Sequence, residues 1–348
     1  MTDKPTRRPP RRRTEVWKPT PELLQHMPKV SGNDLNGVGE TTSRRPVPVM
    51  WDWKVPIAHA DMQEEISRRH SEDPHIGQVL RRRETDAYRP APLAAKRHEG
   101  LSAAEWTAQV REFALTKSPV PVEDVGVVQM RQEWVFDGHE VTEQFAVLLL
   151  VRMDHSELSK APDWPAGQEV QRQYNRGTDA ARALADWLRS RGWPARGHGG
   201  PSGGPFTMTP AAIEAGLGEL GKHGSLIHRE FGSSFRLACV LTDVPLLTGS
   251  PDVFGADDFC HKCRICVDAC PPDAILPEKT MVRGVEKWYV DFDRCLPFFA
   301  EANSCGVCIA VCPWSKPGRA QKMASVMLAR RDGAPSTANA QDTTVADA

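Results

Sequence analysis

The spacing of hydrophobic and polar positions changes at about residue 106. Residues 1–50 hold eight prolines and show little periodicity, which predicts an extended or disordered arm. Residues 51–105 stay polar, and "RRRETD" and "RPAP" interrupt any long element, so we expect helical fragments joined by irregular connections. Beyond that point "EWTAQVREFAL" has a helical period, whereas "VGVVQM" and "FAVLLLVRM" are aliphatic runs typical of buried strands.

The clearest helical pattern covers residues 175–192. Its apolar positions recur with the spacing of one helix face, at Ala180, Ala183, Leu184, Trp187 and Leu188. Gly192 is placed to cap its C-terminus. A second helix is predicted from Thr209 as the N-cap, with Pro210 at the first helical position. The run "FRLACVL" then predicts another strand.

Strands that alternate with helices predict an α/β or α+β core over residues 106–254. The concentration of cysteines after it predicts a separate module over residues 255–318. Residues 319–348 are expected to form a tail, and the small polar residues of "DGAPSTANAQDTTVADA" predict disorder at its end.

The net charge and the hydropathy of the chain give no sign of a nucleic-acid or membrane partner. The chain has 44 basic and 45 acidic residues, so its net charge of −1 gives no electrostatic reason to expect nucleic acid or an anionic membrane. The longest apolar run, "FAVLLLV", is far shorter than the roughly 20 residues that span a bilayer. The run "RRPPRRR" resembles the start of a twin-arginine signal, but prolines and charges follow it instead of an apolar segment. We therefore expect a cytoplasmic protein without an export signal.

Eight of the nine cysteines fall into two runs. The first holds Cys260, Cys263, Cys266 and Cys270 before Pro271, and the second holds Cys295, Cys305, Cys308 and Cys312 before Pro313. The spacing C-x2-C-x2-C-x3-C-P is that of bacterial two-cluster ferredoxins. A disulfide framework would not concentrate its cysteines in this way, which favours a reducing compartment. The ninth, Cys239, lies in the apolar "RLACVL" and is interpreted as a small buried hydrophobic residue.

In ferredoxin spacing, the fourth thiolate of each run ligates the other cluster. We therefore predict one [4Fe–4S] cluster on Cys260, Cys263, Cys266 and Cys312, and a second on Cys270, Cys295, Cys305 and Cys308. The long gap between Cys295 and Cys305 departs from the simple repeat. Zinc fits less well, because zinc ribbons use pairs of cysteines that lie far apart in sequence. Such clusters transfer electrons, so a group in the upstream residues should receive them.

The order of four landmarks resembles that of the corrinoid-dependent reductive dehalogenases. They are "GLGELGKHGSLIHREFGSSFRLACVLTDVPL", "FCHKCRICVDACP", "KWYVDFDRC" and "CGVCIAVCPWSKP", and the resemblance covers about residues 170–318. It implies a nitroreductase-like core that binds base-off cobalamin beside two [4Fe–4S] clusters. Cob(I)alamin would then remove halide from an organohalide, expected to be aromatic, and a proton would replace it. The protein would supply a dry pocket, orientation and a proton donor.

In that family the proton donor is a tyrosine assisted by a basic side chain. Of the three tyrosines in this chain, Tyr289 lies in the cysteine module and Tyr88 in the unmatched segment, so the resemblance implies Tyr174. Arg236 is the first choice for the basic partner and Lys222 is the second. A nearby cation favours the phenolate form of a tyrosine.

The corrinoid contacts are expected within "GLGELGKHG". Gly216, Gly218 and Gly221 weaken a helix there, which suggests a close backbone approach to a bulky flat group, and His223 is a further candidate contact. Soluble relatives often carry a fused reductase region after the clusters, and no such region follows Pro313 here. The resemblance therefore implies an external electron donor, such as a ferredoxin, a flavodoxin or a reductase.

Two other functions are compatible with these motifs. An epoxyqueuosine reductase also joins a corrinoid domain to two clusters and has a "CPW" motif, but it uses an aspartate acid and acts on tRNA. A non-catalytic iron–sulfur electron carrier is the other alternative, and a flavin in the core is not excluded by the motifs. Tyr174, the "KWYVDFDRC" connector and the absence of a basic excess favour the dehalogenase.

Overall fold

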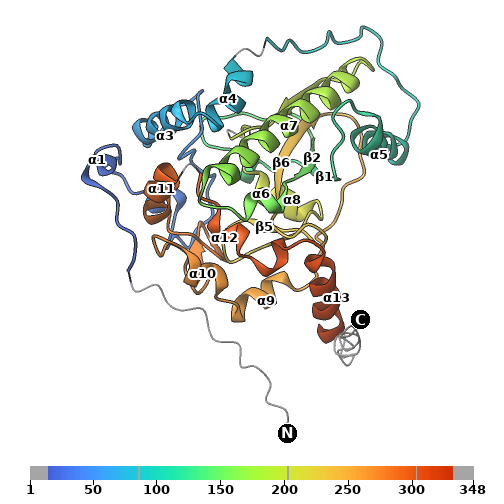
Figure 1. The fold of residues 1–348 in the computed structure, drawn as a ribbon. Coiled ribbons are helices and arrows are strands. Elements are labelled where there is room, and N and C mark those ends of the chain that lie inside the picture. The colour runs from blue at the N-terminus through green and yellow to red at the C-terminus, as the bar shows by residue number, and fades with distance from the viewer. Residues whose placement is uncertain (1–14, 85–86, 202–203, 303, 332–348) are drawn as a thin grey trace, which may run out of the picture.

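A four-stranded antiparallel sheet lies at the centre of the upstream part of the molecule (Figure 1). The computed structural model describes residues 15–84, 87–201, 204–302 and 304–331. The strands run in the order β1 (Asp124–Gln129), β2 (Phe145–Arg152), β6 (Phe235–Thr242) and β3 (Ala195–His198). The three aliphatic runs predicted as strands are confirmed. All their pairings are antiparallel, so the core is α+β.

Both faces of the sheet are buried, which explains why β2 is apolar at successive positions. Val147 and Leu149 face the layer formed by α5 (Ala103–Glu112), the π-helical turn η1 (Phe113–Lys117) and α7 (Trp164–Arg189). Leu148 and Leu150 face α8 (Met208–Glu214) and the 3-10 turn η2 (Gln132–Trp134). Cys239 is fully buried in this second layer, as its apolar surroundings predict.

The helix predicted over residues 175–192 begins much earlier, at Trp164. Pro165 lies in its first turn, where a missing N–H costs nothing, so this proline does not break the helix. Gly192 confirms the predicted cap, since it has φ +77° and Trp193 N–H donates to the Leu188 carbonyl at 3.1 Å. Tyr174 therefore lies within the helix and not ahead of it.

The helix predicted from Thr209 is also shifted. Its N-cap is Thr207, so Thr209 and Pro210 both lie inside α8. It ends at Glu214, just before two glycines with positive φ, Gly216 and Gly218. The chain then forms a short hairpin of β4 (Glu219–Leu220) and β5 (Leu226–Ile227), which leads toward the cysteine module.

The cysteine module consists of short helices around one hairpin. The helices are α9 (Ala256–Lys262), α10 (Ile265–Ala269), α11 (Phe292–Glu301) and α12 (Val307–Ala310), with the 3-10 turn η3 (Pro313–Ser315). The hairpin pairs β7 (Thr280–Val282) with β8 (Val285–Lys287). The region expected to be a tail begins with a further helix, α13 (Arg319–Arg331), which buries Ala320 and Ala324 against Trp314. The disorder predicted for residues 332–348 lies outside the described residues.

The N-terminal arm lies along the cysteine module (Figure 1). Its described part contains α1 (Pro21–Leu24) and α2 (Gly32–Asn36). Trp17 N–H donates to the Pro271 carbonyl at 3.1 Å, and Gly32 N–H donates to the Asp293 carboxylate at 2.8 Å. The arm is therefore held by hydrogen bonds to residues far along the chain.

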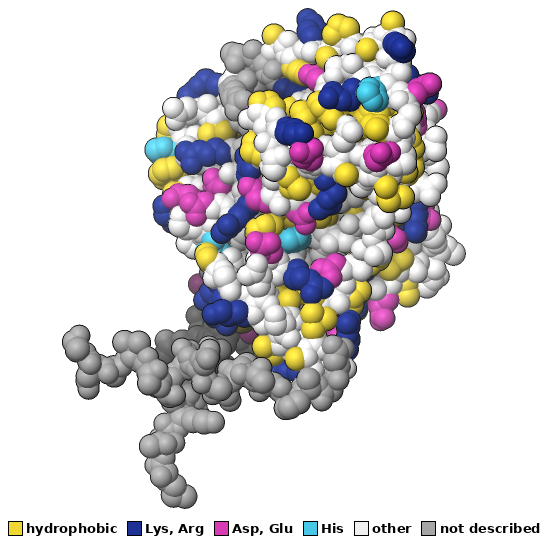
Figure 2. Space-filling view, turned by 90° about the vertical axis from the view of Figure 1, so that its right-hand side faces the viewer, with side chains coloured by type: hydrophobic (Ala, Val, Ile, Leu, Met, Phe, Trp, Pro, Cys, Tyr) yellow, Lys and Arg dark blue, Asp and Glu magenta, His cyan; other side chains and the backbone are white. Residues whose placement is uncertain are grey.

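The segment after the arm contributes helices, as the pattern predicts. They are α3 (Ala60–Glu72) and α4 (Ile76–Glu84), and α4 packs against α7 while α3 packs against α11. The short α6 (His155–Leu158) connects β2 to α7. Within the described ranges, no helix is long and apolar enough to cross a membrane. Basic and acidic side chains are interspersed on the face that Figure 2 shows.

Candidate functional site

Four cysteines of the two runs line one small pocket, which we call cage A. Cys260, Cys263 and Cys266 come from the first run and Cys312 from the second, together with Lys222, His223, Phe259, Pro313 and Trp314. Helices α9 and α10 bring the first three together, and η3 begins directly after the fourth. This grouping of three cysteines with the distant Cys312 is the one that ferredoxin spacing predicts.

The remaining four cysteines form a second group, cage B. Burial raises the pKa of Cys308, and the nearby Cys305, Cys295 and Cys270 raise it further, with a contribution from Cys266 of cage A. Cys270 and Cys295 likewise interact with each other. Two residues beside cage B, Ser304 and Cys305, have positive φ values of 85° and 40°, which are uncommon for residues with a side chain.

The chemistry of both cages depends on burial. Burial, reinforced by neighbouring thiolates, raises the pKa of Cys266 and of Cys295 to about 12, and it raises that of Cys260 similarly. Crowded buried thiolates of this kind require a cation among them. In the part of the chain that the structure describes, no three His, Cys, Asp or Glu side chains converge as ligands of a single metal ion.

Two adjoining cavities lie beside the sheet. The helix cavity, of about 480 Å³, runs along α3, α4 and α7, and the sheet cavity, of about 400 Å³, runs along β6 and the start of α8. Both are lined by Trp51, Tyr174, Gly200, Pro201 and Arg236. Their sizes fall in the range of ligand and cofactor sites.

Tyr174 and Arg236 meet where the two cavities join. The guanidinium carbon of Arg236 lies 5.3 Å from the centroid of the Tyr174 ring, a cation–π arrangement. The Arg236 Nε atom is buried and has no hydrogen-bond partner. Among the described residues, neither the Tyr174 hydroxyl nor the Arg236 guanidinium has a hydrogen bond or an ion pair. The structure therefore brings together the tyrosine and the basic residue that the sequence singled out first.

Lys222, the second choice for the basic partner, lies elsewhere. It lines cage A and neither of the two cavities. Its backbone N–H donates to the Cys260 Sγ at 3.5 Å, and its ammonium lies 4.6 Å from the centroid of the Trp288 ring. This position argues against a role beside Tyr174.

His223 lies in the wall between cage A and the sheet cavity. It lines cage A, and its Nε2 is 3.2 Å from the hydroxyl of Ser233, which lines the sheet cavity. Burial lowers the pKa of His223 to about 4, so the imidazole is neutral at neutral pH. A contact between His223 and a corrinoid stays a prediction.

The three glycines predicted to contact the corrinoid pack against the chain itself. A Cβ on Gly218 would lie 2.2 Å from the Ile227 carbonyl oxygen, and one on Gly216 would lie 2.7 Å from that of Ser250. A Cβ on Gly221 would lie 2.6 Å from the His223 ring. Their close backbone approach is thus explained by protein atoms, and the glycine of this region that lines a cavity is Gly224.

Some residues of the site were not singled out by the sequence patterns. Trp51 lines both cavities with φ +61°, an uncommon conformation for an aromatic residue. Glu219 accepts backbone N–H groups of Phe254 and Ala256, each at 2.9 Å, and so fixes the start of the helix that carries Cys260. The only sequence signals were the pair of tryptophans in "WDW" and one acidic residue in a glycine-rich run.

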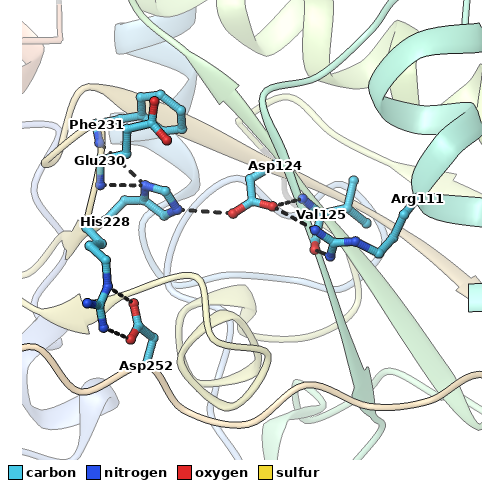
Figure 3. A network of polar contacts seen from close by, with 8 residues as sticks. Arg111, Asp124, Val125, His228, Glu230, Phe231 and Asp252 are labelled. Atoms are coloured by element: carbon cyan, nitrogen blue, oxygen red, sulfur yellow. Dashed lines mark hydrogen bonds and ion pairs between the residues drawn. The ribbon is translucent and has the colours of Figure 1, made fainter. Parts of the chain in front are cut away.

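A polar network ties the loop after β5 to β1 (Figure 3). The His228 Nδ1 accepts the N–H groups of Glu230 and Phe231, so its Nε2 donates to Asp124 Oδ2 at 3.2 Å. Burial opposes the charge of Asp124, but His228 and the Val125 N–H together hold the pKa of this carboxyl below its usual value. This network orients the loop that leads into β6.

The cysteine module and most of the chain resemble known proteins. Residues 259–316 match the 4Fe-4S dicluster domain family. A tetrachloroethene reductive dehalogenase of Desulfitobacterium hafniense is 34% identical over 183 residues, which are 49% of this chain and 33% of that protein. A solved reductive dehalogenase, whose structure suggests a mechanism for B12-dependent dehalogenation, superposes with a TM-score of 0.68 at 20% identity. That superposition covers 89% of this chain and 49% of the other.

The chain is also similar in sequence to the alternative family, the epoxyqueuosine reductases. An epoxyqueuosine reductase of Synechococcus sp. is 33% identical over 167 residues, which are 41% of this chain and 47% of that protein. The fold shared with the solved reductive dehalogenase extends over far more of this chain than either similarity in sequence. The chain spans about a third of the length of the curated dehalogenase and about half of the solved one. Over the part that it spans, the chain is similar to reductive dehalogenases in sequence and shares their fold.

Proposed function

We propose that this chain uses two [4Fe–4S] clusters and a corrinoid to replace the halogen of an aromatic organohalide with hydrogen. The observation that carries this proposal is the pairing of Tyr174 with Arg236 at the junction of two cavities, one of which adjoins cage A through His223 and Ser233. An electron route, a cofactor site and a proton donor would thus adjoin one another.

Cages A and B would each hold one cluster. Support comes from the ferredoxin spacing, from the match to a dicluster family and from the pocket in which three cysteines of one run meet Cys312 of the other. Because the wall of cage A also borders the sheet cavity, the cluster in cage A would deliver electrons to the cofactor. The cluster in cage B would receive them from an external donor such as a ferredoxin or a flavodoxin.

The two adjoining cavities are lined by groups that suit a corrinoid. Gly200 and Gly224 offer backbone without side chains, and Thr207, Thr209 and Ser225 offer hydroxyl groups for the polar rim of such a cofactor. The buried Nε of Arg236 is a donor that has no acceptor among the described residues, as expected beside a ligand site. When bound, the corrinoid supplies the low-potential cobalt chemistry that cleaves a carbon–halogen bond.

The residues of this chain would orient the substrate and supply the proton. The Tyr174 hydroxyl has no hydrogen bond to another described residue, so its proton is available to the carbon that loses the halide. Arg236 would stabilise the negative charge left on the phenol oxygen. Trp51 and Phe299 line the helix cavity, and their rings favour a flat aromatic substrate and exclude water.

The proposal is tested on the full chain reconstituted under anaerobic conditions. We expect about eight irons per chain, a change in the visible spectrum on binding about one cobalamin, and halide release from a halogenated phenol with a chemical reductant. Material that carries iron but has no affinity for cobalamin would overturn the dehalogenase proposal and leave an electron carrier. Activity on epoxyqueuosine tRNA without halide release would instead favour the alternative family.

A further inference from the structure

Lys222 is a buried cation without a carboxylate partner. Its side chain is among the largest fully buried ones, with 2% of the residue exposed. Its ammonium has no hydrogen bond or ion pair with any described residue, and its contact is the face of Trp288 at 4.6 Å. The carboxylate that binds that tryptophan, Asp257, is paired with Lys279 at 2.7 Å and accepts the Trp288 Nε1–H at 2.5 Å.

This arrangement requires a negative charge that no carboxylate of the described residues supplies. Burying an ammonium is costly unless an anion or several acceptors compensate for its lost hydration. A cation–π contact restores only part of that free energy. The remaining side of Lys222 faces cage A, whose pocket it lines together with four cysteines. The position of Lys222 therefore fits an anionic occupant of that cage.

We propose that Lys222 is the charge partner of the iron–sulfur cluster in cage A and sets the reduction potential of that cluster. The inference rests on the proposed iron–sulfur occupancy of cage A, but it needs neither the corrinoid nor the dehalogenase reaction. A [4Fe–4S] cluster with four thiolates is a dianion when oxidised and gains one more negative charge on reduction. A buried cation stabilises the reduced form more, so Lys222 raises the potential.

Two further features beside cage A strengthen this role. The Lys222 N–H donates to the Cys260 Sγ at 3.5 Å, and a hydrogen bond to a ligand sulfur also favours the reduced cluster. His223, the next residue, is neutral at neutral pH because of its burial and adds no second charge. The dipeptide thus offers the cage one cation and one amide donor.

The experiment is a redox titration of the reconstituted full chain, followed by electron paramagnetic resonance of the reduced clusters. Lys222→Met keeps the length of the side chain and removes its charge. We expect the midpoint potential of one of the two clusters to fall, with at least a tenfold shift toward its oxidised form at a fixed potential, equivalent to about 59 mV for one electron. Lys222→Arg should keep the potential near that of the original protein.

Lys262→Met is the matched control, because Lys262 precedes the cage cysteine Cys263 in sequence but is exposed to water. Water and salt screen the charge of Lys262, so Lys262→Met should change the midpoint potential much less than Lys222→Met does. Equal potentials in the original protein and Lys222→Met, or an equal fall in Lys222→Met and Lys262→Met, would overturn the proposal. Lys222→Met could lose half of its iron and so prevent the measurement of one potential. In that case, full iron content in Lys222→Arg supports the role of the charge. Loss of iron from both variants refutes that role. If the potential falls as expected but the original protein releases no halide, the role of Lys222 stands and the dehalogenase function fails.

Discussion

Tyr174 and Arg236 come from two rigid elements that pack against each other. Tyr174 lies within α7 and Arg236 is the second residue of β6, with 5.3 Å between the guanidinium carbon and the ring centroid. The packing of α7 across β6 is dense: a Cβ on Gly177 would lie 3.2 Å from that of Ala238. Side chains on such elements keep their geometry better than side chains on loops, which suits a proton donor and its charge partner.

Tyr174→Phe should abolish most of the halide release while leaving cofactor binding intact. The change removes the proposed proton donor, and general acid catalysis contributes roughly 10²- to 10⁴-fold to rates. Iron content and the spectral change on adding cobalamin should stay as in the original protein. Tyr88→Phe is the control, because the Tyr88 hydroxyl bonds Asp186 at 2.9 Å and lines neither cavity. Full halide release by Tyr174→Phe would show that another group supplies the proton.

Arg236→Met should lower the rate of halide release, because Arg236 is proposed to act on the reaction through its effect on Tyr174. If the cation acts by stabilising the charge left on the phenol oxygen, its removal costs little once that oxygen is absent. The effects of Arg236→Met and Tyr174→Phe should therefore be strongly non-additive in the double variant. Arg236→Lys should retain part of the activity because it keeps the charge. Rate losses that simply multiply would mean that the two side chains act independently.

Asp179→Asn distinguishes the two families of relatives. Asp179 lies on the same helix as Tyr174 and lines the helix cavity, so it is a carboxylate near the proposed reaction site. An aspartate acid would be expected if this chain worked like an epoxyqueuosine reductase. We expect Asp179→Asn to change halide release less than tenfold, in contrast to Tyr174→Phe. A larger loss in Asp179→Asn than in Tyr174→Phe would favour an aspartate as the acid.

The sequence predicts the strands and cages because these depend on local patterns. The aliphatic runs at β1, β2 and β6 and the cysteine spacing each carry their own signal. The first half of α7 was missed because Trp164, Pro165 and Gly167 resemble a break, although a proline in the first turn is compatible with a helix. The helix α13 was missed because only Ala320 and Ala324 are fully buried there, too few for a clear apolar face.

Tertiary contacts determine the other features of the structure that the sequence patterns do not predict. Strand order and direction follow from how both faces of the sheet are covered, which the apolar run in β2 does not encode. Trp51 reaches the cavities because its segment is held by other parts of the chain: its N–H donates to Gln63, and Asp52 accepts a hydrogen bond from His139 at 2.6 Å. Such partners are distant in sequence and leave no periodic signal.

Glu219→Ala should lower the stability of the cysteine module. The Glu219 carboxylate accepts the N–H groups of Phe254 and Ala256 at the start of α9, where no other side chain caps the helix. Hydrogen bonds to a charged group contribute about 1.5 to 3 kcal/mol to stability, so the thermal midpoint should fall by several degrees. Iron content should fall as well, because α9 carries Cys260. Glu219→Gln keeps one acceptor oxygen, so its thermal midpoint and iron content should lie between those of the original protein and Glu219→Ala.

His198 should make the stability of the protein depend on pH. Burial, together with the charges of Arg196 and Lys54, lowers the pKa of His198 to about 4, and its buried Nε2 has no hydrogen-bond partner. The unfolded chain, with a histidine pKa of about 6.5, therefore binds this proton more readily than the folded protein does. The resulting loss of stability is absent above about pH 6.5, grows as the pH falls, and levels off below about pH 4 at roughly 3 kcal/mol.

His198→Gln removes this titration and tests the prediction. Between pH 7.5 and pH 5 the original protein should lose about 2 kcal/mol more stability than the variant. Thermal midpoints of the iron-loaded proteins under anaerobic conditions give the comparison, and carboxylates that titrate in the same range cancel in the difference. His98→Gln controls for the loss of an exposed imidazole. Parallel pH profiles for the original protein and His198→Gln would mean that water or a local rearrangement solvates the charged ring in the folded state, since only then would burial exert no penalty on its protonation.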